Sequence, residues 1–140
     1  MRQALGLFLV IVAALLGADR WLGYGAAYEI GYGALALMGA MIAATFLWLW
    51  YERTTPLALG MAFSWAGAAS VMGWWWVFNL LDRPRVMVGS EVLFAFLSLY
   101  FVGAILHFSV MQRSLGLHGL MFAIPLLGAT LLSAAIHMLF

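Results

Sequence analysis

Two residue types are missing from this chain of 140 residues, and both absences narrow what it can do. There is no cysteine, which excludes disulfides, thiolate nucleophiles and cysteine-ligated metal or iron–sulfur centres. Lysine is also absent, so all six basic residues are arginines, and they are dispersed along the chain. Because binding to nucleic acid needs clustered positive charge, we expect no nucleic-acid partner.

Charge of either sign is scarce. Only 8% of the residues are charged and 67% are hydrophobic, with a formal net charge of +1. A soluble domain carries roughly 25% charged and 45–50% apolar residues. A core of this size cannot hide so much apolar surface, so we expect a lipid bilayer to cover it. Arginine without lysine, together with abundant alanine, glycine and tryptophan, is typical of GC-rich bacterial genomes, which indicates a bacterial inner membrane.

Long apolar runs predict an all-α integral membrane protein. About 20 apolar residues in a helix cross a bilayer, and five runs approach that length. We predict one domain over residues 1–140, a bundle of five transmembrane helices, or four if the first run does not span. A signal peptide is the alternative for that first run, but Leu16 is a poor residue three before a cut after Ala18, so we expect the run to be retained. The predicted spans are about 4–21, 31–51, 57–78, 91–111 and 117–140.

The orientation of such a bundle is nearly undetermined. Five spans place the two termini on opposite sides, and each side receives three arginines, so the positive-inside rule gives a tie. We favour a cytoplasmic N-terminus. The arginines of one side are Arg2, Arg53 and Arg113, and those of the other are Arg20, Arg83 and Arg85.

Aromatic residues follow two patterns. Tyr24, Tyr28 and Tyr32 are four residues apart, so a helix would line them on one face. They then form either a headgroup-level anchor, which we favour, or a stripe facing a ligand. In contrast, the consecutive residues 74–76 are all tryptophan and point about 100° apart on a helix. They cannot form one binding stripe, and an interfacial belt fits them better.

All eleven charged residues fall at span ends or in connections on this map, and none lies in mid-span. Carboxylates within the membrane are typical of proton relays and coupling-ion sites, so a self-contained ion pump is disfavoured. An interfacial polar loop contains Asp82, Arg83, Arg85 and Glu91. It is either a small lipid-modifying site or, as we favour, a solvated connection. Since the chain has no serine elbow, HExxH motif or phosphate loop, we lean against an enzyme.

Two histidines flank the last predicted turn. His107 and His118 are expected roughly 10 and 6 Å below the same membrane surface on neighbouring helices. Two such histidines can ligate a b-type haem, and Gly103, one turn before His107, would leave open space for a flat macrocycle. The simpler interpretation is that His118 is interfacial and His107 bonds a neighbouring helix.

Three functions remain open at this point. The favoured one is an accessory or structural subunit of a larger membrane complex, whose partners are the lipid bilayer and other membrane proteins. The second is a haem- or quinone-binding redox protein that uses His107 and His118. The third is a small-solute transporter or channel that assembles as a homo-oligomer.

Overall fold

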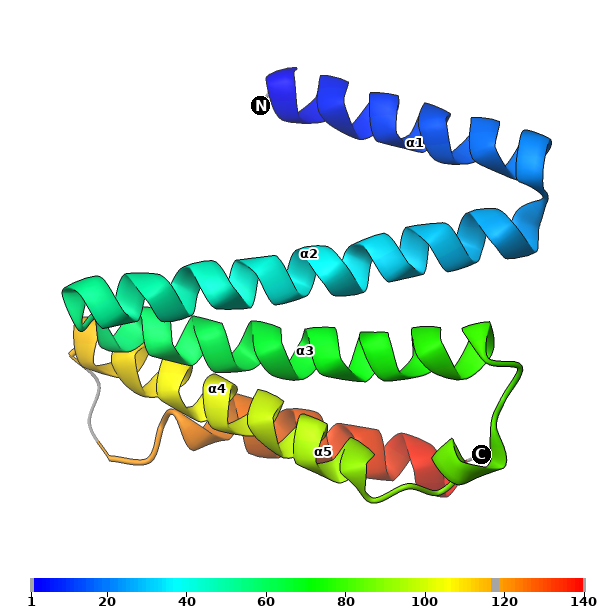
Figure 1. Ribbon diagram of the computed structural model, residues 1–140. Helices are drawn as coiled ribbons and strands as arrows, with labels where there is room; N and C mark the ends of the chain where they lie inside the picture. The colour runs from blue at the N-terminus through cyan, green and yellow to red at the C-terminus, as the bar shows by residue number, and fades with distance from the viewer. Residues whose placement is uncertain (1, 117–118, 140) are drawn as a thin grey trace.

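The computed structural model describes residues 2–116 and 119–139, and within these ranges the chain is helical with no strand (Figure 1). Five α-helices are joined by short connections, the longest of which contains a 3₁₀ turn, η1. The helices are α1 (Arg2–Leu22), α2 (Tyr24–Arg53), α3 (Pro56–Leu80), α4 (Val92–Ser114) and α5 (Ala123–Leu139), and η1 is Arg85–Met87.

Helices that follow one another in the chain are the ones that pack together. Close packing joins α2 to α3 and α3 to α4, whereas α1 contacts α2 less extensively and α5 touches α4 lightly. Figure 1 shows successive helices running in opposite directions, with α1 diverging from α2 and with the first turn of α1 and the last turn of α5 at opposite ends. The centre of the molecule is therefore the antiparallel trio α2–α3–α4.

Glycines bring α3 and α4 into backbone contact. A side chain at Gly60 would begin 2.8 Å from the backbone nitrogen of His107, and one at Gly103 would begin 2.6 Å from the Ser64 hydroxyl oxygen. A side chain at Gly67 would likewise collide with the α4 backbone. Such contacts hold helices together in lipid, where no hydrophobic drive acts between them.

The α2–α3 contact has the same character. The indole of Trp76 covers Gly33, and Ala69 lies 3.1 Å from where a side chain of Gly39 would start. Every residue that is buried in the described part of the chain is alanine or glycine. The buried residues are Ala27, Gly33, Ala36, Gly39, Ala43, Ala58, Gly60, Ala62, Gly67, Ala69 and Gly103.

Large apolar side chains lie outside rather than inside. Phe8 is 60% exposed and Leu131 69% exposed, and no residue of α1 or α5 whose burial the structure describes is buried. Within the described residues, four helices are long and apolar enough to cross a membrane. These are Gln3–Leu22, Tyr24–Arg53, Pro56–Leu80 and Val92–Ser114.

The second helix begins earlier than the sequence predicts. Its N-cap is Gly23, whose φ of 81° is left-handed and suits glycine, and this single residue connects α1 to α2. The helix therefore starts at Tyr24 instead of near residue 31. As a consequence Glu29, which the prediction placed in a connection, lies in the second turn of α2.

The last helix begins later than predicted. Residues 119–122 form turns, and α5 starts at Ala123 instead of near residue 117. The Gln112 side chain holds this connection: its amide nitrogen donates to the Gly119 carbonyl at 2.9 Å, and its oxygen accepts from the Phe122 N–H at 2.7 Å. With 17 residues, α5 is about 25 Å long, shorter than the roughly 30 Å hydrocarbon core of a bilayer.

Candidate functional site

The end of α1, the start of α2 and the end of α3 lie at the same end of the molecule (Figure 1), and polar residues line a cleft there. The antiparallel pairing of α2 with α3 places Gly33 against Trp76. One turn further toward this end, Glu29 of α2 and Asn79 of α3 line the same cleft. Helix pairing thus brings together residues that are about 50 positions apart in the chain.

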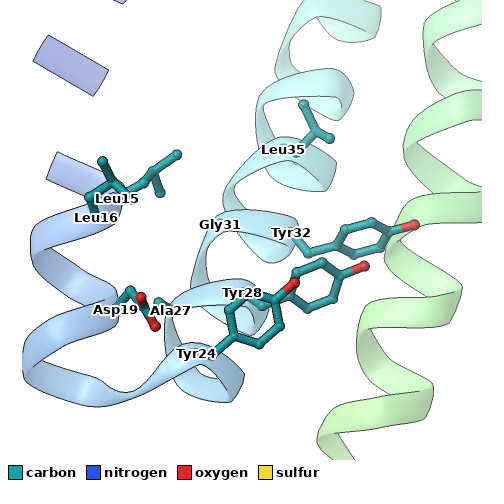
Figure 2. A pocket seen from close by; sticks show the side chains of 9 residues that line it. All are labelled: Leu15, Leu16, Asp19, Tyr24, Ala27, Tyr28, Gly31, Tyr32 and Leu35. Carbon is teal, nitrogen blue, oxygen red and sulfur yellow. The ribbon is translucent and has the colours of Figure 1, made fainter. Parts of the chain in front are cut away.

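The three tyrosines form a continuous stack along the first turns of α2. Ring centroids are 6.1 Å apart for Tyr24 and Tyr28 and 5.6 Å apart for Tyr28 and Tyr32, with interplanar angles of 22° in both pairs. The predicted alignment on one helix face is confirmed, because α2 is helical from Tyr24 onward. Figure 2 shows their hydroxyl ends directed away from α1.

An apolar cleft of about 380 Å³ lies between α1 and α2 beside this stack (Figure 2). Its one charged lining residue is Asp19, from the last turn and a half of α1. At Gly31 the cleft is narrow, since a side chain there would start 3.7 Å from Leu15. The lining residues are Leu15, Leu16, Asp19, Tyr24, Ala27, Tyr28, Gly31, Tyr32 and Leu35.

A second cleft, of about 410 Å³, lies between the start of α2 and the end of α3 and has a mixed polar and charged lining. Tyr24 and Tyr28 line both clefts, so the two meet at the tyrosine stack. The residues that line the second cleft are Tyr24, Gly25, Tyr28, Glu29, Asn79, Asp82 and Arg83.

The charged side chains of this polar cleft are free to bind a ligand. Glu29, Asp82 and Arg83 make no side-chain hydrogen bond or ion pair with any residue that the structure describes. The Asn79 amide nitrogen is engaged, donating to the Trp75 carbonyl oxygen at 3.0 Å. Two carboxylates and one guanidinium therefore line this cleft, and none of them is paired with a residue in the described part of the chain.

The backbone holds Asp82 and Arg83 in an unusual conformation. Both have left-handed φ values, 54° and 59°, although neither is glycine, and each such residue costs about 1–2 kcal/mol. Two hydrogen bonds close the end of α3 around them: Asp82 N–H to the Asn79 carbonyl at 3.1 Å and Arg83 N–H to the Phe78 carbonyl at 2.8 Å. This is the bonding of a Schellman cap, and it fixes where the two side chains start.

The predicted interfacial loop is thus only partly assembled at the cleft. Asp82 and Arg83 line it, whereas Arg85 and Glu91 do not. Sequence reasoning missed Glu29 as a member of this group because it assigned that residue to a connection. The signal was its position directly after Tyr28, inside a stripe whose four-residue spacing already indicated a helix.

The histidine pair is described only in part. His107 is half-buried on α4, its ring is edge-on to Phe108, and its Nδ1 atom is buried without a hydrogen-bond partner among the described residues. His118 lies outside the residues that the structure describes. The expectation of open space beside Gly103 is wrong, because the α3 backbone at Ser64 fills that space.

Other polar groups gather less closely. Across residues 2–116 and 119–139, no three His, Asp or Glu side chains lie together as metal ligands would. The candidate site is therefore the pair of clefts that meet at the tyrosine stack. No family model, no curated protein and no solved structure matches this chain.

Proposed function

We propose that the chain is a multi-pass protein of a bacterial inner membrane that serves as an accessory subunit, with α1 and α5 packed against transmembrane helices of a partner. The observation that carries the proposal is the packing. Among the residues whose burial the structure describes, only alanine and glycine are buried, and none of these buried residues lies in α1 or α5, although both helices are largely apolar.

Two physical arguments support this function. Helices that bury only small residues against each other keep their large side chains for lipid or for another protein. Moreover, α5 contacts the rest of the chain lightly, and at about 25 Å it is short for a bilayer. A short helix that is weakly held by its own chain gains most from contacts with a neighbouring subunit.

A photo-crosslinking amino acid at exposed Leu9 of α1 or Leu131 of α5 tests the proposal in native membranes, with buried Ala62 of α3 as the matched control position. We expect Leu9 and Leu131 to crosslink to a second polypeptide, which also co-purifies at fixed stoichiometry in mild detergent. Ala62 should crosslink only within the chain.

Two other outcomes would overturn the accessory role. Crosslinks to a second copy of the chain, without another polypeptide, would favour a homo-oligomeric transporter or channel. The absorption spectrum of the same preparation addresses the redox alternative: a Soret band that disappears in His107→Ala, but not in His137→Ala, would identify a haem protein.

A further inference from the structure

We propose that the two clefts that share Tyr24 and Tyr28 in their linings together bind one phospholipid with a zwitterionic headgroup. One acyl chain lies in the apolar cleft between α1 and α2, the phosphate contacts Arg83, and the ammonium group contacts Glu29 and Asp82. The inference rests on the proposed membrane placement, but not on the identity of any partner polypeptide.

The apolar cleft has the dimensions of a site for an acyl chain. Its lining on α2 runs from Tyr24 to Leu35, which is about 16 Å at ~1.5 Å per residue. The hydrocarbon core of a bilayer is about 30 Å thick, so the cleft spans the depth of one leaflet. At its narrow middle the absence of a side chain at Gly31 leaves the remaining space beside Leu15, and leucines of α1 and α2 line the cleft (Figure 2).

The polar cleft borders the tyrosine stack on the side of α3, whereas the apolar cleft borders it on the side of α1. Because Tyr24 and Tyr28 line both, a molecule that passes along the tyrosine stack has its apolar part on the α1 side and its polar part beside the end of α3. This change from apolar to charged lining matches an amphiphile that stands along the helices, with its head at the end of the molecule.

Charge complementarity selects the headgroup. Arg83 can bind a phosphate through two parallel N–H bonds, and Glu29 and Asp82 supply two acceptors for an ammonium group. The tyrosine rings add a cation–π surface beside them. A headgroup with only negative charge would satisfy Arg83 but would face two uncompensated carboxylates, so it fits this cleft less well.

The cleft is also prepared for a ligand. Glu29 projects from a helix, and the capped backbone at Asp82 and Arg83 fixes the other two positions. None of the three side chains forms a hydrogen bond or an ion pair with another described residue. A bound zwitterion would place its phosphate beside Arg83 and its ammonium group beside the two carboxylates.

Native mass spectrometry of the purified full-length protein tests the proposal. The protein is equilibrated in detergent with equal amounts of phosphatidylethanolamine and phosphatidylglycerol that carry identical acyl chains. We expect one retained lipid per chain, with phosphatidylethanolamine preferred roughly two- to fivefold, the ratio that a partly exposed ion pair provides.

Variants then distinguish recognition of the headgroup from binding of the acyl chain. Glu29→Gln combined with Asp82→Asn should abolish the preference, and Arg83→Gln should reduce retention of both lipids. Gly31→Leu should reduce retention of both by filling the apolar cleft. Arg85→Gln and Glu91→Gln alter charges of the same connection that lie outside the cleft, and they should leave the preference unchanged.

Equal retention of both lipids by the unaltered protein would overturn the proposal, and so would a preference that survives in Glu29→Gln/Asp82→Asn. A thermal unfolding curve of each variant shows that the fold persists. Crosslinking from Leu9 and Leu131 is measured separately, so loss of the lipid preference with intact crosslinks contradicts only the lipid site. Loss of the crosslinks with intact lipid preference contradicts only the accessory role.

Discussion

The smallest side chains determine how closely the central helices of this molecule approach. Gly103 occupies the point where α4 touches the α3 backbone at Ser64, and Gly33 receives the indole of Trp76. A glycine inside a helix normally costs about 0.5–1 kcal/mol relative to alanine. At these positions that cost is offset by contacts that a larger residue would prevent.

Gly103→Ala should therefore destabilise the protein by about 1–3 kcal/mol, because the new methyl group forces α3 and α4 apart. Gly128→Ala is the matched control: that glycine lies in α5 with nothing within 4 Å of an added Cβ, so helix propensity should make the variant equal to or slightly more stable than the original. Thermal unfolding in detergent, followed by tryptophan fluorescence, gives the comparison. Equal stability of the two variants would mean that the α3–α4 contact is looser than described.

Some site residues were predictable from local spacing, and others only from helix pairing. The four-residue repeat of tyrosines indicated a shared face, and the polar run 79–85 indicated a loop with Asp82 and Arg83. That Asp82 and Arg83 line the same cleft as Glu29 depends on the antiparallel register of α2 and α3, which no short pattern in the sequence encodes. The prediction of open space beside Gly103 was wrong for the same reason. A glycine in the sequence shows that a side chain is absent, but it does not show which neighbouring helix occupies that space.

At the scale of helices, starts with a strong local signal were predictable. Thr55-Pro56 has the composition of a helix start, with proline at the first helical position, and α3 begins at Pro56 with Thr55 as N-cap. Ser90-Glu91 has the composition of a helix start with serine as the cap, but the N-cap of α4 is Glu91, and the Ser90 hydroxyl accepts from the Val92 N–H at 3.4 Å. The tryptophans at 74–76 diverge as expected: Trp74 meets Phe96 of α4, and Trp76 covers α2.

The start of α5 was not predictable from apolar composition, because the turn that precedes it is also largely apolar. Gly119, with φ of 80°, was the available signal. Pro125 lies in the first turn of α5. Its missing N–H needs no partner there, since the first N–H groups of a helix have none inside it.

Gln112→Ala should loosen the connection between α4 and α5, because the Phe122 N–H and the Gly119 carbonyl both lose their bond to the Gln112 side chain. We expect faster hydrogen exchange at Phe122 and faster tryptic cleavage after Arg113, with a loss of about 1–3 kcal/mol for the group left unpaired. Ser114→Ala removes only a bond within α4, at 2.7 Å to the Met111 carbonyl. A cleavage rate in Gln112→Ala no greater than in Ser114→Ala would contradict this role of Gln112.

For the whole molecule, the proposed placement in a membrane can be tested through the number of helices that cross it. Because the chain lacks cysteine, single cysteines report the side on which each helix end lies. If all five helices cross, a membrane-impermeant maleimide should label two sets of positions from opposite sides. One set is Gln3, Thr55 and Leu115, and the other is Leu22, Ser90 and Met138.

The position that decides the result is Met138. Labelling of Met138→Cys from the same side as Leu115→Cys would mean that α5 enters the membrane without crossing it. Labelling of Leu22→Cys from the same side as Gln3→Cys would remove α1 from the set of crossing helices. Both results would leave the trio α2–α3–α4 in place, because the contacts of α2 with α3 and of α3 with α4 involve neither outer helix.

The glycine contacts between α3 and α4 also determine where the chain can tolerate a change of length. Gly60 faces His107 and Gly67 faces Tyr100. The two contacts are therefore seven residues, or about two turns, apart on both helices. An inserted residue between Gly60 and Gly67 would rotate one of them by about 100° and bring a bulky neighbour against α4. An insertion among residues 85–89, which join α3 to α4 without entering the contact, would leave the pairing intact. Natural variation in length should therefore concentrate in that connection and avoid the glycine-bearing turns.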